Sequence, residues 1–202
     1  MKVLAIGAHP DDIEPQIGGT IAKIVKENGK VLNVVVTDTG TGANIEDRNY
    51  EGKQAAKILG ASFLSLGIPQ LEKPHFRELV NSFDNLIAKE KPDLIFSVNS
   101  ADSHQDHKDV AQAIEASCRK NTISVIECNQ ALPGGIHSPD LNYFVDISKE
   151  HDIKIKSLKA YSSQIEKYGT YWIEAIESRD KLWGFNIGTK FAEACKIKKL
   201  IK

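Results

Sequence analysis

Apolar residues recur along the chain in two patterns, short continuous runs and runs with helical spacing. The continuous runs are typical of strands that are buried on both faces of a parallel sheet. We expect such strands at residues 3–6, 31–37, 63–66, 93–98, 123–126 and 143–147. Apolar residues spaced three and four positions apart predict amphipathic helices between and after these strands. The helical patterns cover residues 17–25, 46–59, 76–87, 110–118, 153–165 and 172–183.

Strands that alternate with helices predict βαβ crossovers, and therefore an α/β, Rossmann-like fold whose mostly parallel sheet has helices on both faces. The chain contains no internal repeat, low-complexity tract or linker, and its 202 residues suit one hydrophobic core. We therefore expect a single domain over residues 1–202. If the strand order is 3-2-1-4-5, the first and fourth strands are neighbours, and a ligand binds beyond their carboxyl ends.

Composition and charge narrow the classes of function. The chain has 26 Lys and Arg against 27 Asp and Glu, and a net charge of −1 gives no field that attracts nucleic acid or an anionic membrane. No apolar run approaches the ~20 residues that cross a bilayer, and the N-terminus lacks a signal-peptide pattern. Three cysteines without Cys-x-x-Cys spacing suit a reducing compartment. We expect a cytoplasmic protein with no nucleic-acid partner and no membrane span.

Two polar clusters follow the first and fourth predicted strands. Ala-His-Pro-Asp-Asp occupies residues 8–12, and Asp-Ser-His-Gln-Asp-His occupies residues 102–107. Each cluster alone has a structural explanation, because Asp12 could cap a helix and the second cluster could be a solvated loop. Both clusters are expected at the ligand-binding edge of the sheet, however, and a chance meeting of two such groups is the weaker explanation.

The residue types in the two clusters suit a divalent-metal site with two histidines and one carboxylate. Imidazole and carboxylate are usual ligands of catalytic zinc, and three protein ligands leave room for water and substrate. We select His9, Asp12 and His107 as ligands, because Pro10 starts a tight turn between the first two. Asp11 could then accept a proton from the water that the metal activates. The same ligand set also suits ferrous iron.

A second histidine in the later cluster is left for another role. Hydrolysis of an amide needs a group that stabilises the oxyanion and assists the leaving amine, and a cationic His104 held by Asp106 would suit this. In the alternative arrangement, His104 binds the metal and His107 is the auxiliary group. The spacing of these residues leaves both arrangements open.

Several segments together resemble one known family. The strongest are the paired motifs at residues 8–12 and 104–107, and weaker ones lie at residues 18–22, 48–51, 66–69 and 191–194. They are similar to motifs of the zinc-dependent N-acetylglucosaminyl deacetylases, the relatives of phosphatidylinositol-glycan deacetylase and of the deacetylases of mycothiol and bacillithiol synthesis. The resemblance extends over nearly the whole chain.

The resemblance implies specific roles within the two clusters. Zinc would be held by His9, Asp12 and His107. Asp11 would be the general base, and His104 would be the auxiliary acid. The choice between the two histidines of the second cluster therefore comes from the resemblance alone.

The resemblance also implies a substrate-binding residue and an assembly. Arg48 would contact the sugar, and Glu51 would orient Arg48. An ordinary exposed ion pair on a helix is the simpler explanation for these two residues. Relatives further suggest a homo-oligomer.

Three positions depart from the family pattern. Gln16 stands where the family commonly has glycine, Gln70 where it usually has aspartate, and Tyr161 where it often has histidine. None of the three belongs to the expected metal chemistry. All of them bear on which substrate the site accepts.

We therefore expect hydrolysis of an N-acetyl group from an amino sugar or its conjugate, releasing acetate and a free amine. A metal-dependent amidase that acts on a non-sugar N-acyl amine is the alternative. A nucleotide-binding module is a third hypothesis, but residues 7–10 lack the Gly-x-Gly-x-x-Gly phosphate cradle. The adjoining Asp11 and Asp12 would also repel a pyrophosphate.

Overall fold

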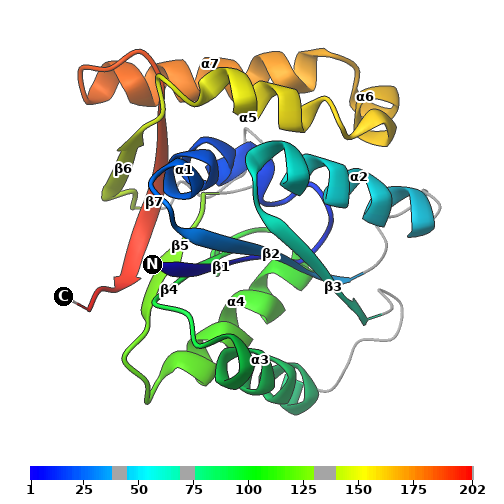
Figure 1. Cartoon of the computed structure of the whole chain (residues 1–202), viewed down its shortest axis with the longest axis vertical. Helices are drawn as coiled ribbons and strands as arrows, with labels where there is room; N and C mark the ends of the chain where they lie inside the picture. The colour runs from blue at the N-terminus through cyan, green and yellow to red at the C-terminus, as the bar shows by residue number, and fades with distance from the viewer. Residues whose placement is uncertain (38–44, 69–75, 130–139, 202) are drawn as a thin grey trace.

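The computed structural model describes residues 1–37, 45–68, 76–129 and 140–201, with only the backbone described for residues 45–47. The departure from the family pattern at Gln70 lies outside these ranges. Within them, the chain forms a sheet of seven strands covered by helices on both faces (Figure 1). The expected α/β fold is therefore confirmed.

The strand order of the sheet is β3-β2-β1-β4-β5-β7-β6, which confirms the expected order of the first five strands. These five are parallel, and β7 is antiparallel to both of its neighbours. The strands are β1 (Lys2–Gly7), β2 (Lys30–Thr37), β3 (Ser62–Ile68), β4 (Leu94–Ser97), β5 (Ser124–Glu127), β6 (Tyr143–Asp146) and β7 (Ala192–Lys199).

The seventh strand, β7, was not expected from the sequence. Its residues, Ala-Glu-Ala-Cys-Lys-Ile-Lys-Lys, include few of the β-branched and aromatic side chains that favour strands. It forms a strand because it pairs with β5 on one side and β6 on the other. Long-range pairing thus outweighs its weak local preference.

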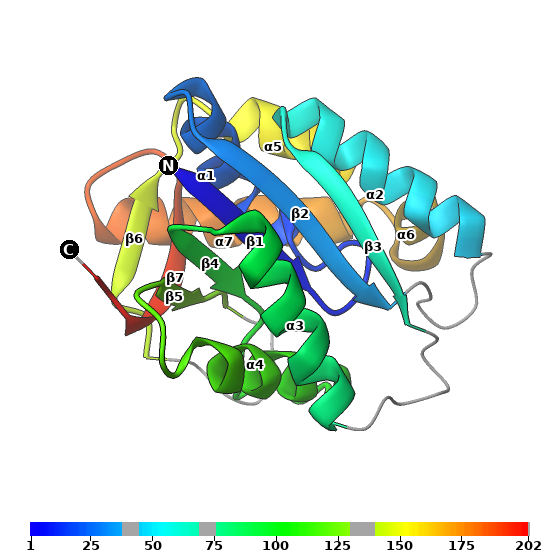
Figure 2. The ribbon, with the colours of Figure 1, turned by 60° about the horizontal axis from the view of Figure 1, so that its bottom comes forward.

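The helices lie in two layers (Figures 1 and 2). The layer on one face contains α3 and α4, and the layer on the other contains α1, α2, α5, α6 and α7. Their bounds are α1 (Glu14–Lys26), α2 (Ile45–Leu59), α3 (Phe76–Glu90), α4 (Gln105–Cys118), α5 (His151–Leu158), α6 (Ser162–Tyr168) and α7 (Tyr171–Asn186). Trp172 and Trp183 of α7 are buried, in agreement with a role in packing.

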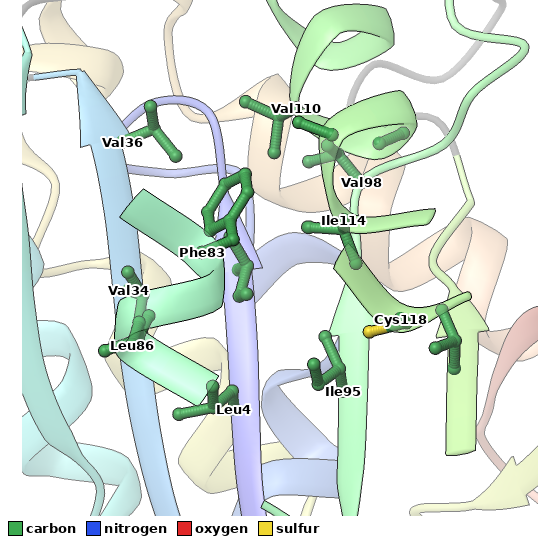
Figure 3. Close-up of a cluster of buried hydrophobic side chains, with 14 of the residues drawn as sticks. Leu4, Val34, Val36, Phe83, Leu86, Ile95, Val98, Val110, Ile114 and Cys118 are labelled. Atoms are coloured by element: carbon green, nitrogen blue, oxygen red, sulfur yellow. The ribbon is translucent and has the colours of Figure 1, made fainter. Parts of the chain in front are cut away.

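Successive side chains along a strand point to opposite faces of the sheet and pack in two separate hydrophobic cores. Leu4 of β1 packs beneath α3 and α4 with Phe83 and Ile114 (Figure 3). Val3 points to the opposite face and packs in a cluster with Ile21 of α1. Both faces of β1 are thus buried, as its continuous apolar run predicts.

The pattern expected as one helix over residues 153–165 forms two helices, α5 and α6. The break lies at Tyr161, whose backbone is non-helical, with φ −86° and ψ 71°. Its side chain is fully buried, and its hydroxyl donates a hydrogen bond to Glu14 Oε2 at 2.8 Å. This contact with α1 explains why the chain leaves the helical path here.

The sheet brings the two polar clusters together. β1 and β4 are adjacent and parallel, with Ile6 paired to Ser97 at their carboxyl ends. The segments at residues 8–12 and 102–107 therefore leave the same edge of the sheet. No helix in the described part of the chain is long and apolar enough to cross a membrane.

Candidate metal centre

The first cluster forms a tight turn between β1 and α1. Asp12 N donates to His9 O at 3.3 Å, and Asp12 Oδ2 accepts from His9 N at 2.7 Å. Gly7 makes room for this turn, because a Cβ there would lie 3.0 Å from the Asp12 Cβ. Asp12 therefore folds back over its own turn. The structural alternative, in which Asp12 caps α1, is not found, since the cap residue is Ile13 without a side-chain bond.

The second cluster forms the loop after β4 and the first turn of α4. Asp102 Oδ1 accepts from His104 N at 2.9 Å, and Asp102 Oδ2 lies 2.9 Å from His107 Nδ1. His104 is the cap residue of α4, and its Nδ1 accepts from Asp106 N at 3.2 Å. The loop therefore holds both imidazole rings in defined orientations.

The histidines of the two clusters converge. One ring nitrogen from each of His9, His104 and His107 lies within 4.8 Å of the other two. Asp12 Oδ2 lies 3.2 Å from His107 Nε2 and 3.5 Å from His9 Nδ1. The three expected ligands thus lie together, with His104 as a fourth donor beside them. Three imidazoles and one carboxylate form a donor set that suits zinc or ferrous iron.

Carboxylates surround the two buried histidines and favour positive charge there. Burial alone would lower the pKa of His9, but hydrogen bonds with Asp106 and Asp12 raise it to about 9. Burial is likewise outweighed at His107, where Asp12 and Asp102 raise the pKa to about 10. The pKa of Asp12 is held well below its usual range by His107 and His9, despite its burial. A cation between these side chains would meet the same negative field.

His104 has a different environment from the other two histidines. Its side chain is 48% exposed, and partial burial together with His107 and His9 lowers its pKa. Asp106 Oδ2 lies 3.0 Å from His9 Nε2 but 4.0 Å from His104 Nδ1. The expected arrangement, a cationic His104 held by Asp106, therefore differs from the observed one, in which Asp106 lies closer to His9.

Asp11 lies beside the histidines and is held by Arg48. The Arg48 guanidinium donates from NH2 to Asp11 Oδ1 at 2.9 Å and also to Pro10 O. Burial raises the pKa of the Asp11 carboxyl to about 7, although Arg48 opposes this effect. Arg48 itself is only 2% exposed. In the described structure its guanidinium is thus directed at the turn that carries Asp11, and the sugar contact stays a prediction.

Glu51 reaches Arg48 through a residue of α6. The Glu51 carboxylate accepts from Ser163 N at 2.7 Å and from Ser163 Oγ at 2.6 Å. Ser163 Oγ in turn lies 3.2 Å from Arg48 NH1. Glu51 therefore contacts Ser163, and Ser163 contacts Arg48, so any effect of Glu51 on Arg48 is indirect. Both Arg48 and Glu51 are buried, which excludes the simpler explanation of an exposed ion pair.

Two residues that support the site were not singled out from the sequence. Asp102 orients His107, as carboxylates commonly do for ligand histidines. Its place in the same short cluster, five residues before His107, could have indicated this. Ser163 lies 115 residues from Arg48 and carries no local signal of its contact.

Two departures from the family pattern are buried in this structure. Gln16 is 1% exposed, so it does not form an open rim beside the metal centre. Tyr161 is also 1% exposed and donates to Glu14 rather than facing solvent. Neither side chain is therefore exposed for contact with a substrate in this structure.

Comparison with known proteins identifies the family. Residues 4–118 match the family model described as "PIG-L: GlcNAc-PI de-N-acetylase". Diacetylchitobiose deacetylase of Thermococcus kodakarensis is 27% identical over 97% of this chain and 82% of its own. The deacetylase YaiS of Escherichia coli K12 is 32% identical over 58% of this chain and 68% of its own.

The same fold occurs in a solved structure, the conserved protein TT1542 of Thermus thermophilus. The two structures superpose with a TM-score of 0.84 at 24% identity, covering 99% of this chain and 96% of the other. The family model spans both polar clusters, since these lie at residues 8–12 and 102–107. The chain therefore belongs to the PIG-L family, the GlcNAc-PI de-N-acetylases.

Proposed function

We propose that this protein removes the acetyl group from an amino sugar of the N-acetylglucosamine type, or from its conjugate, by metal-dependent hydrolysis. The products are acetate and a free amine. The observation that carries the proposal is the convergence of His9, Asp12 and His107 beside the partly buried carboxyl of Asp11. The relatives from Thermococcus kodakarensis and Escherichia coli, both named as deacetylases, support the same reaction.

His9, Asp12 and His107 are the residues proposed to hold the metal, which we assign as zinc, with ferrous iron as the alternative. When bound, the ion would polarise the acetyl carbonyl and lower the pKa of water in the site. Asp102 supports this arrangement because its contact with His107 Nδ1 leaves Nε2 directed at Asp12. His104 is the other candidate ligand, and its greater exposure favours a role toward the substrate instead.

Asp11 is proposed to accept the proton of the attacking water. Its burial raises the pKa to about 7, so the carboxyl can both take up and release a proton near neutral pH. Arg48 holds one carboxylate oxygen and leaves lone pairs on the group for the water. The same carboxyl, once protonated, is our candidate for returning the proton to the leaving nitrogen.

His104 is proposed to stabilise the oxyanion as a neutral imidazole. Its Nδ1 accepts the N–H of Asp106, so the neutral ring carries its proton on Nε2. An Nε2–H donor at the exposed side of the cluster suits a developing negative oxygen. Asp106 would then act mainly on His9, which it contacts at 3.0 Å.

The proposal also covers the cellular location and the assembly of the enzyme. Three free cysteines, all buried, support a reducing compartment, and we propose a cytoplasmic location. We also propose a homo-oligomer, as the resemblance suggests, with a small amino-sugar molecule as the substrate partner. Sedimentation of the purified protein tests the oligomer.

A substrate panel tests the reaction. We would measure free-amine release from diacetylchitobiose, N-acetylglucosamine conjugates and simple N-acetyl amines, with and without a chelator. Release from sugars that stops with chelator and returns with added zinc is the expected result. Release from non-sugar amines alone would replace the sugar substrate with the amidase alternative. No release from a metal-loaded protein would refute the proposed reaction, and failure to bind metal would refute the proposed centre.

A further inference from the structure

The backbone at Asp11 has an unusual conformation. Its φ is +91°, a region that residues other than glycine rarely adopt, so the backbone is strained here. Surrounding contacts must therefore hold this residue in place. Arg48 supplies two of them, because it bonds both the Asp11 carboxylate and the carbonyl of Pro10 that precedes it.

Gln164 supplies a third contact, to the other oxygen of the Asp11 carboxylate. With its amide nitrogen facing Asp11, Gln164 donates to Asp11 Oδ2 at 2.9 Å, and its oxygen accepts from Arg48 NH1. The reverse orientation would place the amide oxygen against the carboxylate, so the hydrogen-bond network selects the first. The two oxygens of Asp11 are therefore held by different elements, Oδ1 by α2 and Oδ2 by α6.

The element that carries Gln164 is itself fixed to α2. Ser162 Oγ, Ser163 N and Ser163 Oγ all donate to the Glu51 carboxylate, at distances between 2.6 and 2.7 Å. Glu51 is 5% exposed, so these bonds are shielded from water. The start of α6 thus cannot shift relative to α2 without breaking several buried hydrogen bonds.

We infer that Gln164 is a positioning residue for Asp11, and that it sets the direction in which the carboxylate faces the reacting water. The inference rests on the proposed function, in which Asp11 is the general base. Arg48 alone holds one oxygen and would allow the carboxylate to rotate about that contact. The second bond, to Oδ2, prevents this rotation. The lone pairs that remain on both oxygens then point in a fixed direction relative to the reacting water.

Substitution of Gln164 tests the inference. Gln164→Leu keeps the volume and removes both hydrogen bonds, and Gln164→Glu keeps the shape but removes the donor to Asp11. We expect kcat to fall by about 10-fold to 100-fold in each, because a small misplacement of a reacting group has a large effect. KM and bound metal should stay near the wild-type values. Gln112→Leu, the same change at an exposed position of α4, is the matched control.

A double-mutant cycle separates positioning from general structural damage. If Gln164 acts through Asp11, Gln164→Leu has little further effect on kcat in an Asp11→Asn background. An equal loss in both backgrounds would overturn the inference, because the side chain would then act independently of Asp11. A kcat of Gln164→Glu within about twofold of wild type would overturn it as well.

A crystal structure keeps the test independent of the substrate. If the wild-type protein releases amine from no panel member, the proposed function fails, and the rates carry no information on Gln164. In that case we would compare crystal structures of the wild-type and Gln164→Leu proteins. A rotated Asp11 carboxylate in the variant supports positioning, and an unchanged one overturns it.

Discussion

Two clusters of titratable side chains contrast in this molecule. The metal-centre cluster, defined as His9, Asp12, His104 and His107, lies at the carboxyl ends of β1 and β4. The lysine cluster, defined as Lys154, Asp180 and Glu193, joins α5, α7 and β7. Lys154 Nζ lies 2.6 Å from Asp180 Oδ2 and 2.8 Å from Glu193 Oε1, and all three side chains are fully buried.

The lysine cluster is closed by contacts within the protein. Glu193 also accepts from Gly19 N at 2.9 Å, and from Thr20 N and Oγ1 at 2.7 and 2.6 Å. These bonds tie β7 to α1. Gly18 permits the packing, since a Cβ there would lie 3.1 Å from Lys154 Cγ. Gly18, within the motif at residues 18–22, thus has a structural explanation.

The metal-centre cluster differs because its donor atoms converge while one member, His104, stays about half exposed. Positive charge is favoured there by carboxylates, and the groups that keep Asp12 ionised are the imidazoles of His107 and His9. Burial of charge therefore does not by itself indicate function. Convergence of metal-binding donors beside an exposed side chain is the better indication. Each prediction below perturbs the metal-centre cluster, the neighbouring Asp11, or the lysine cluster.

The largest effect is expected from His107→Ala. Loss of one proposed ligand should abolish bound metal and deacetylase activity together, because three protein ligands are needed to hold the ion. Metal analysis and amine release would measure this. His151→Ala is the matched control, since His151 is equally buried, at 4%, but stacks on Phe191 instead. A variant at His107 that keeps full metal would remove it from the ligand set.

The next effect concerns Asp11→Asn. The variant should bind metal normally and lose about 10²-fold to 10⁴-fold in kcat, the usual contribution of a general base. The exposed Asp84→Asn, on α3, is the control for the same chemical change. Single-turnover rates with a saturating amino sugar would measure the loss. Full activity in the Asp11 variant would contradict its assignment as the base.

Glu193→Gln perturbs the lysine cluster. Glutamine removes one of the two negative charges that contact Lys154, and its NH2 group would face donors that now bond the Glu193 carboxylate. We expect a loss of about 3–5 kcal/mol in the free energy of unfolding, the usual effect of breaking a buried pair. Urea unfolding would measure it, with the exposed Glu166→Gln as control. In folded Glu193→Gln protein, the metal content should equal that of wild type. A loss of metal without loss of stability would mean that this cluster also supports the site.

The contrast also explains which features were predictable from the sequence. The meeting of the two polar clusters was predictable, because each follows a recognisable apolar strand within a short segment of the sequence. The lysine cluster was not, because Lys154 and Glu193 are far apart in the sequence and β7 has weak strand preference. The contacts that hold Asp11 were missed for the same reason, since Gln164 and Arg48 meet only after α6 packs on α2.

The split between α5 and α6 has the same origin. The helical spacing continues through residues 153–165, so local pattern alone favours one helix. The hydrogen bond from Tyr161 to Glu14 joins residues 147 positions apart. It accompanies a non-helical backbone at Tyr161, where the helix is interrupted. Local periodicity therefore located the elements, whereas long-range polar contacts determined where one of them broke.

The smallest predicted effect is the pH dependence that Asp180 gives to stability. Burial raises the pKa of Asp180 to about 6, although Lys154 opposes this and Arg179 lies 3.9 Å away. Below about pH 4, Asp180 is protonated in both the folded and the unfolded chain. Between about pH 4 and pH 6 the unfolded chain ionises first, so this group's contribution to stability is lost as pH rises.

Asp180→Asn removes that titration and allows it to be measured. The free energy of unfolding of wild type, minus that of the variant, should fall by about 1–3 kcal/mol between pH 4 and pH 7. Urea unfolding at several pH values would give this difference, in which the titration of all other groups largely cancels. A difference that rises with pH would mean that the ion pair with Lys154 outweighs burial. The charged state of the lysine cluster would then increase the free energy of unfolding, rather than decrease it.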